Sequence, residues 1–178
     1  ASIQTTGNKA SGVVLADGTI VEADAVIANA DASLVYNKLI TGHKRTLKKA
    51  RKNIANADVS VAGFSLLLGM RKDPEQVLNH HTILFPENYD AEFDAIFKEG
   101  KPVEKPTIYI CAPQDELMSK DENLEGWFVL VNAPTHGQFD WNNAEFSTKY
   151  ANSIIDQIEA RGISVRDRLE SLTIRTPA

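Results

Sequence analysis

The chain has 178 residues, of which 43% are hydrophobic and 24% charged, and its formal net charge is −5. This composition is ordinary for a globular chain that can bury a sizeable core, whereas the acidic balance disfavours nucleic-acid partners, which need a basic face. No run reaches the roughly 18 apolar residues that cross a bilayer. The single cysteine, Cys111, cannot form an internal disulfide, and no secretory apolar segment opens the chain, so we expect a cytoplasmic location.

The first predicted element is a β-hairpin between Ser11 and Ile27. Its turn is Asp17-Gly18, a dipeptide that suits the positive-φ positions of tight hairpins. The run ADAVIA that follows predicts a buried strand. Asp31 then stands where its carboxylate can accept hydrogen bonds from the first turn of a helix in ASLVYNKLI.

An amphipathic basic helix is predicted next, in residues 44–53, because Leu47, Ala50 and Ile54 recur at helical spacing. A solvated face is one interpretation of its charges. The alternative is peripheral membrane contact with anionic lipid, where each cation adds about 1 kcal/mol. The basic residues are Lys44, Arg45, Lys48, Lys49, Arg51 and Lys52.

The remaining pattern predicts strands mixed with helices. Residues 58–70 are apolar enough for a central strand, with Gly63 at a bulge or close approach. HTILF predicts a strand, residues 88–97 a short helix, and the two prolines of residues 101–106 a loop. TIYICA and GWFVLVNA are expected to pair as neighbouring strands.

The chain then predicts its longest helix and a last strand. Apolar residues from Phe146 to Ile158 share one helical face, Gly162 is placed to end the helix, and Leu172 to Arg175 form the strand. Since regular βαβ alternation is absent, we expect an α+β fold with a mixed, mostly antiparallel sheet covered by helices, preceded by the hairpin and strand.

Few residues predict chemistry by themselves. The sequence contains no GxGxxG, P-loop, GxSxG, HExxH or CxxC motif. His80 and His81 would point to opposite faces of a strand, so we expect no metal site there; a structural histidine or a cavity-lining one remains. Cys111 is expected to be a small buried hydrophobe, since no histidine is near it in sequence. The acidic run from Asp115 to Glu125 lacks the ligand pattern of a calcium loop and predicts a solvated turn.

Three segments in order resemble the phytoene desaturase family, the carotenoid desaturases of the FAD-dependent, amine oxidase-like superfamily. They are VIANAD at Val26 to Asp31, His80-His81 with ILFPENYDAEFDAIF, and PTIYICAP followed by GWFVLVNAPTH. The resemblance extends from about Gly12 to Pro134.

This resemblance implies a discontinuous FAD-binding domain with an inserted substrate domain. Residues 1–31 would end an FAD-binding segment, residues 32–57 form a helical connection, and residues 58–178 bind substrate. Because the family's glycine-rich phosphate loop and its C-terminal flavin motif are not in this sequence, we expect an internal piece of a larger enzyme that is inactive alone and does not hold FAD tightly. The expected cofactor contacts are Asn29, Ala30 and Asp31, at the end of a strand where ligands collect.

The implied reaction removes hydrogen from adjacent carbons of a long polyisoprenoid such as phytoene, with the flavin accepting a hydride. Such a substrate calls for an apolar tunnel rather than charged catalysts, and no catalytic residue is named. The expected substrate contacts are His80, His81, Phe64 and Leu66. Two alternatives remain: another flavoprotein of the superfamily, such as an amine oxidase or a carotenoid isomerase, and a non-catalytic lipid-binding module.

Overall fold

The fold was analysed in a computed structural model that describes residues 1–7, 9–40, 44–58, 60–115 and 121–178. The chain divides into two compact units, Ala1–Val59 and Ser60–Ala178. Each unit has its own sheet and its own buried residues, and they are described in turn.

The first unit contains a three-stranded antiparallel sheet in the order β1-β2-β3. The strands are β1 (Ser2–Thr6), β2 (Lys9–Val14) and β3 (Ile20–Glu22). The predicted hairpin is confirmed: Gly18 has a φ of 86°, and the Asp17 carboxylate accepts from the Thr19 amide at 2.9 Å. The predicted strand at ADAVIA is wrong, because residues 23–28 form no strand, with only the Ala23 amide donating to the Ser11 carbonyl of β2, and Ile27 is 95% exposed.

Two helical segments complete this unit. Helix α1 (Ala32–Leu34) continues as a π-helical turn, η1 (Val35–Leu39), and helix α2 spans Lys44–Ala55. The predicted cap is confirmed, since Asp31 Oδ1 accepts from the Ser33 amide at 2.8 Å. Val35 and Leu47 are buried, and Arg51 Nε donates to the Tyr36 carbonyl at 2.7 Å.

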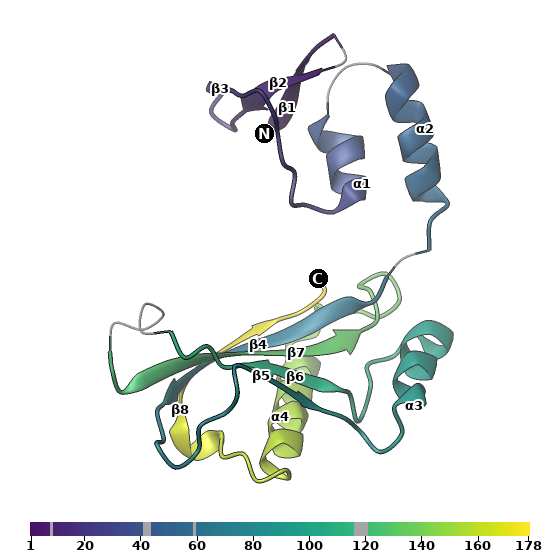
Figure 1. Ribbon diagram of the computed structural model, residues 1–178. Coiled ribbons are helices and arrows are strands. Elements are labelled where there is room, and N and C mark those ends of the chain that lie inside the picture. Colours follow the sequence, from purple (N-terminus) through teal and green to yellow (C-terminus); the bar gives the residue numbers. More distant parts are fainter. Residues whose placement is uncertain (8, 41–43, 59, 116–120) are drawn as a thin grey trace. The chain divides into compact units, whose positions relative to one another are not determined.

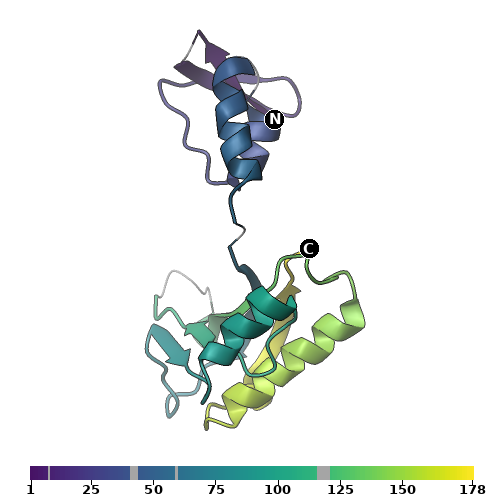
Figure 2. The ribbon, with the colours of Figure 1, turned by 90° about the vertical axis from the view of Figure 1, so that its right-hand side faces the viewer.

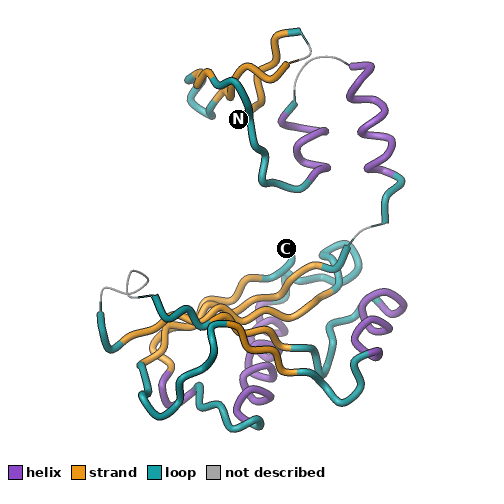
Figure 3. The backbone as a smooth tube through the Cα atoms, in the orientation of Figure 1, coloured by secondary structure: helices purple, strands orange, loops and turns teal. Residues whose placement is uncertain are grey.

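The second unit is built on a five-stranded antiparallel sheet in the order β5-β6-β7-β4-β8 (Figures 1 and 3). The predicted pairing of TIYICA with GWFVLVNA is confirmed, and so is the central place of the strand within residues 58–70. The strands are β4 (Ala62–Arg71), β5 (His81–Leu84), β6 (Ile108–Cys111), β7 (Leu124–Ala133) and β8 (Leu169–Arg175).

Helix α4 (Ala144–Glu159) covers one face of this sheet (Figure 2). Asn143 caps it by accepting from the Phe146 amide at 3.0 Å, and Gly162 follows it with a φ of 81°. Because side chains alternate along a strand, every second residue of β4 and β7 packs under α4. The core strand residues are Phe64, Leu66, Leu68, Met70, Trp127, Val129 and Val131, and the helix residues include Ala151, Ile154, Ile155 and Ile158.

Gly63 confirms one of its two predicted roles. A Cβ at this position would lie 2.8 Å from Leu130 Cδ1, so the glycine allows a close approach of β4 and β7. The irregularity in β4 lies elsewhere, between Gly69 and Met70 in the pairing with β8.

Helix α3 (Asp90–Phe93) continues as a π-helical turn, η2 (Asp94–Glu99), and ends at Gly100 with a φ of 63°. Its Glu92 is 1% exposed and accepts from the Thr107 amide and from Asn132 Nδ2, both at 2.8 Å. This carboxylate ties α3 to the start of β6 and the end of β7. A short 3-10 turn, η4 (Arg166–Arg168), leads into β8, and the whole is the expected α+β fold with a mostly antiparallel sheet.

Candidate functional site

The face of the sheet opposite α4, here called the open face, carries two rows of side chains that cross all five strands. Register places His81, Cys111, Phe128, Leu67 and Thr173 in one row, and Ile83, Tyr109, Leu130, Ser65 and Arg175 in the other. Ile83 is 51% exposed and Phe128 36%, and Ser65 alone among these ten residues is buried. A large part of the open face is therefore apolar and accessible.

Exposed aromatic rings extend this apolar surface beyond β5. Phe85 contacts Tyr89, Tyr89 contacts Phe93, and Phe93 contacts Phe97, with ring centroids 5.7, 5.2 and 6.4 Å apart. Phe85 and Phe97 are 55% and 54% exposed. We call these four residues the aromatic row. Contiguous exposed rings of this kind mark interaction or ligand sites more often than structural cores.

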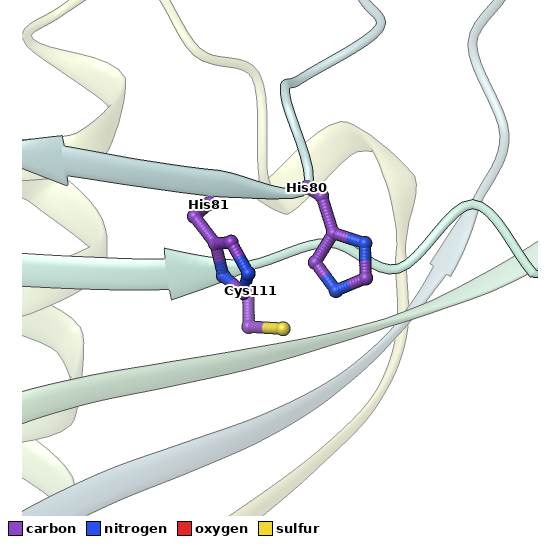
Figure 4. A group of neighbouring side chains, drawn as sticks. All are labelled: His80, His81 and Cys111. Carbon is purple, nitrogen blue, oxygen red and sulfur yellow. The ribbon is translucent and has the colours of Figure 1, made fainter.

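Two histidines and the cysteine converge at one end of the open face (Figure 4). The nitrogen and sulfur atoms that His80, His81 and Cys111 can offer lie within 4.8 Å of one another. The prediction that the histidines point to opposite faces is wrong: β5 begins only at His81, and the backbone before it brings the two ring centroids to 4.4 Å. No histidine is near Cys111 in the sequence, but the pairing of β5 with β6 makes His81 its cross-strand partner.

Tyr109 completes this cluster. Its hydroxyl lies 2.8 Å from His81 Nδ1, and the two rings stack with centroids 5.9 Å apart. The pKa of the Tyr109 phenol lies above its ordinary value, chiefly because of its hydrogen bond with the Cys111 thiol. The four side chains thus form one connected polar group beside an apolar surface.

The other two predicted substrate contacts lie in the core. Phe64 and Leu66 are 0% exposed, and the Phe64 ring packs against Trp141 and Tyr150 at centroid distances of 5.4 and 5.0 Å. Neither residue offers surface to a ligand on this chain, so their substrate role stays a prediction that their position does not favour.

The predicted cofactor contacts Asn29, Ala30 and Asp31 lie together in an exposed segment before α1. The Asp31 carboxylate accepts from Ser33 Oγ as well as from the Ser33 amide, and these bonds hold its pKa below its ordinary value, the side-chain bond contributing most. An anionic carboxylate already committed to capping repels phosphate. The Asp31 carboxylate therefore does not favour a phosphate contact at this position, and the role of Asn29, Ala30 and Asp31 as cofactor contacts stays a prediction.

The basic residues of α2 lie on two different faces of the helix. Arg45, Lys48, Lys49 and Lys52 follow the i, i+3, i+4, i+7 spacing of one helical face, and all four are exposed. Leu47, Ala50, Arg51 and Ile54 follow the same spacing on another face and are buried or half-buried. The predicted apolar stripe is confirmed, and Arg51 belongs to it rather than to the exposed cationic face.

One cavity of the second unit, with a volume of about 750 Å³, does not have the lining of the apolar tunnel that the resemblance implies. Charged side chains line much of it, among them Lys72, Asp73, Asp115, Glu122 and Glu125. Part of the predicted acidic turn lines this cavity, while residues 116–120 of that turn lie outside the described residues.

Sequence reasoning missed Ile83, Tyr109, Phe128 and Leu130 as surface residues of a site. Their alternation with core residues is visible in the sequence, but β4 is apolar on both faces, so its pattern does not reveal which face the helix covers. Cys111 was missed because only the β5–β6 register brings it to His81.

Comparisons with known proteins give one consistent result. A lycopene-forming phytoene desaturase from a Paracoccus species is 34% identical over an alignment that covers 100% of this chain and 36% of that protein. A 1-hydroxycarotenoid 3,4-desaturase from a Flavobacterium species is 33% identical over 98% of this chain and 34% of the relative. A zeta-carotene-forming phytoene desaturase from Myxococcus xanthus is 36% identical over 78% of this chain and 26% of the relative. No family model matches the chain.

By their names, these relatives are all carotenoid desaturases. The chain belongs to the phytoene desaturase family. It spans about a quarter to a third of the length of the curated relatives it matches.

Proposed function

We propose that this chain is the substrate-binding part of an FAD-dependent desaturase that acts on a long polyisoprenoid such as phytoene or a related carotenoid precursor. In this proposal, residues 1–31 belong to a segment of the cofactor domain, residues 32–57 form a helical connection, and residues 58–178 bind substrate. The observation that carries the proposal is the open face, where accessible apolar side chains from neighbouring strands form one surface.

The chemistry of a polyisoprenoid explains why such a surface suits it. A hydrocarbon chain makes no hydrogen bonds, so its binding free energy must come from apolar area removed from water, at about 25 cal/mol per Å². Ile83, Phe128 and Leu130 supply apolar contact, and the exposed aromatic row beyond β5 extends it. His80 and His81 lie at the edge of this surface, where an imidazole can border the substrate.

The composition of the open face also distinguishes between the two competing substrate classes, amines and hydrocarbons. An amine oxidase needs a carboxylate or an aromatic cage for its cationic substrate. The two rows of the open face contain no aspartate or glutamate. The lack of a carboxylate favours a neutral hydrocarbon, for a desaturase or for a carotenoid isomerase, over an amine that such a carboxylate would bind.

FAD is the cofactor that we propose for the whole protein, because a desaturase needs an acceptor for the hydrogen it removes. Asn29 and Ala30 are accessible for a contact to it, but this chain lacks the glycine-rich loop that cradles a dinucleotide phosphate. No catalytic step is assigned to residues of this chain, and the chain alone is expected to be inactive.

Substitutions on the open face test the proposal. In the whole protein, Ile83→Asp and Phe128→Asp should each weaken phytoene binding about tenfold or more, because burial of such a side chain contributes about 1.5–3 kcal/mol. Val77→Asp is the matched control, since Val77 is 69% exposed in the same unit but lies in the loop between β4 and β5, outside the two rows of the open face. Binding to liposome-dispersed phytoene and its desaturation would both be measured.

The outcomes separate the hypotheses. Equal binding by all three variants and the unchanged protein would contradict the substrate role of the open face. Phytoene binding without conversion in the FAD-supplied whole protein would favour the lipid-binding module, and conversion without net oxidation would favour an isomerase.

A second proposal concerns how an apolar substrate is reached. Among the described residues, no helix is long and apolar enough to cross a membrane. We propose peripheral contact with anionic lipid through the exposed cationic face of α2, Arg45, Lys48, Lys49 and Lys52. Each should add about 1 kcal/mol at a phosphatidylserine surface. Replacing Lys48 and Lys49 with glutamate should therefore abolish cosedimentation with phosphatidylserine vesicles, whereas the same change at Lys98 and Lys149 of the second unit should not.

A further inference from the structure

We propose that His80, His81 and Cys111 form a binding site for one zinc-class transition-metal ion on the open face. The site is independent of the proposed desaturase function, since it rests only on the three side chains and their surroundings. Zn²⁺ prefers imidazole and thiolate ligands. Three protein ligands and one solvent molecule in the fourth position complete its tetrahedral coordination.

The distances suit this ion. Zn–N bonds of about 2.0–2.1 Å and Zn–S bonds of about 2.3 Å place tetrahedral ligand atoms about 3.3–3.6 Å apart. The three ligand atoms already lie within 4.8 Å of one another. Closing the remaining gap of about 1.2–1.5 Å needs only small side-chain rotations, and both histidine side chains are exposed.

The backbone holds the ligands at this spacing. His81 and Cys111 are directly paired residues on β5 and β6, and the His80 carbonyl accepts from the Ala112 amide at 2.9 Å. These bonds fix both histidines against the strand that carries the thiol. A bound ion would cross-link the edge strand β5 to β6.

Tyr109 is the positioning residue. When His81 Nδ1–H donates to the Tyr109 oxygen, 2.8 Å away, the Nε2 lone pair is left for the metal. The Cys111 thiol loses its proton to solvent as the Metal–S bond forms, so the overall step is metal binding with release of one proton.

Cobalt titration tests the site directly, because Co²⁺ replaces Zn²⁺ and its thiolate gives a charge-transfer absorption that reports a Co–S bond. The full chain, with any affinity tag removed, should bind one Co²⁺ with this band, and Zn²⁺ should displace it. Cys111→Ser should lose the band, and His80→Gln and His81→Gln should each weaken binding about tenfold or more. Tyr109→Phe should weaken binding about tenfold while keeping the band.

His136→Gln is the matched control, since this histidine lies outside the cluster beside Asn142 and should bind Co²⁺ like the unchanged chain. Circular dichroism confirms that each variant is folded. A folded chain that binds no stoichiometric Co²⁺, or one whose binding persists in Cys111→Ser and His80→Gln, would overturn the site. So would an equal loss in His136→Gln.

Discussion

Single buried polar residues decide how the second unit is held together. Glu92 is the clearest, because it is 1% exposed and its carboxylate accepts from two donors, one just before β6 and one in β7. A buried charged acceptor is stabilising only while its donors are present, and the donors depend on it equally.

Glu92→Ala should lower the free energy of unfolding by about 3 kcal/mol, because it leaves the Thr107 amide and the Asn132 side chain without an acceptor. Glu99→Ala is the control on the same helical segment: Glu99 lies on the surface, where its ion pair with Lys101 should contribute less than about 1 kcal/mol. Urea unfolding monitored by circular dichroism measures both. Equal losses in the two variants would contradict the role given to Glu92.

Glu159 should make stability depend on pH. Hydrogen bonds, first of all from the Arg166 amide, hold the pKa of this carboxyl below 4.5. The ionised form is therefore favoured in the folded chain, so its stabilisation is present above the unfolded pKa and is lost as pH falls through the lower folded value.

The test compares unfolding free energies at about pH 7 and about pH 3. Glu159→Gln should lower stability at the higher pH and so reduce the difference between the two. Glu145→Gln removes an exposed ion pair with Lys149 and should leave the difference nearly unchanged. A full-sized difference in Glu159→Gln would count against the proposed linkage.

Among elements, the sheets show what the sequence could and could not predict. Strand existence, the Asp17-Gly18 turn, the Asp31 cap and helix α4 follow from local patterns that the structure confirms. The strand prediction at Val26 and Ile27 was wrong because a segment with a β-type sequence becomes a strand only when a second strand pairs with it. Among the described residues, no strand pairs with Val26 and Ile27. The His–Cys cluster depends on cross-strand register, which no local pattern encodes.

The strand β2 offers a test of backbone geometry. Gly12 has a φ of 154°, and a Cβ there would lie 2.3 Å from the Val21 carbonyl oxygen, so Gly12→Ala should open the three-stranded sheet. Strain of this kind costs about 1–3 kcal/mol before the clash is added. Amide hydrogen exchange should quicken in β1 to β3 and stay unchanged in β4 to β8.

Gly7→Asn is the control, in the turn that follows β1. Its φ of 63° suits asparagine, and nothing lies within 4 Å of a Cβ there. If the amide hydrogens of β1 to β3 exchanged no faster in Gly12→Ala than in Gly7→Asn, the close approach of β2 and β3 would be refuted.

For the whole molecule, the division into two units has a direct consequence. Residues 60–178 contain a complete antiparallel sheet, its covering helix and a continuous core. Expressed alone, they should unfold cooperatively with the midpoint they show within the full chain. Thermal unfolding of both proteins, followed by tryptophan fluorescence from Trp127 and Trp141, measures this, and a non-cooperative transition of the isolated piece would show that its fold depends on residues 1–59.

The central claim is that the open face binds the polyisoprenoid, and photoaffinity labelling of the whole protein tests it most directly. A phytoene analogue carrying a diazirine should label peptides of β5, β6 and β7, at Ile83, Tyr109, Phe128 or Leu130, and excess phytoene should suppress the labelling. Labelling that competes with phytoene but falls entirely outside residues 60–178 would contradict the account.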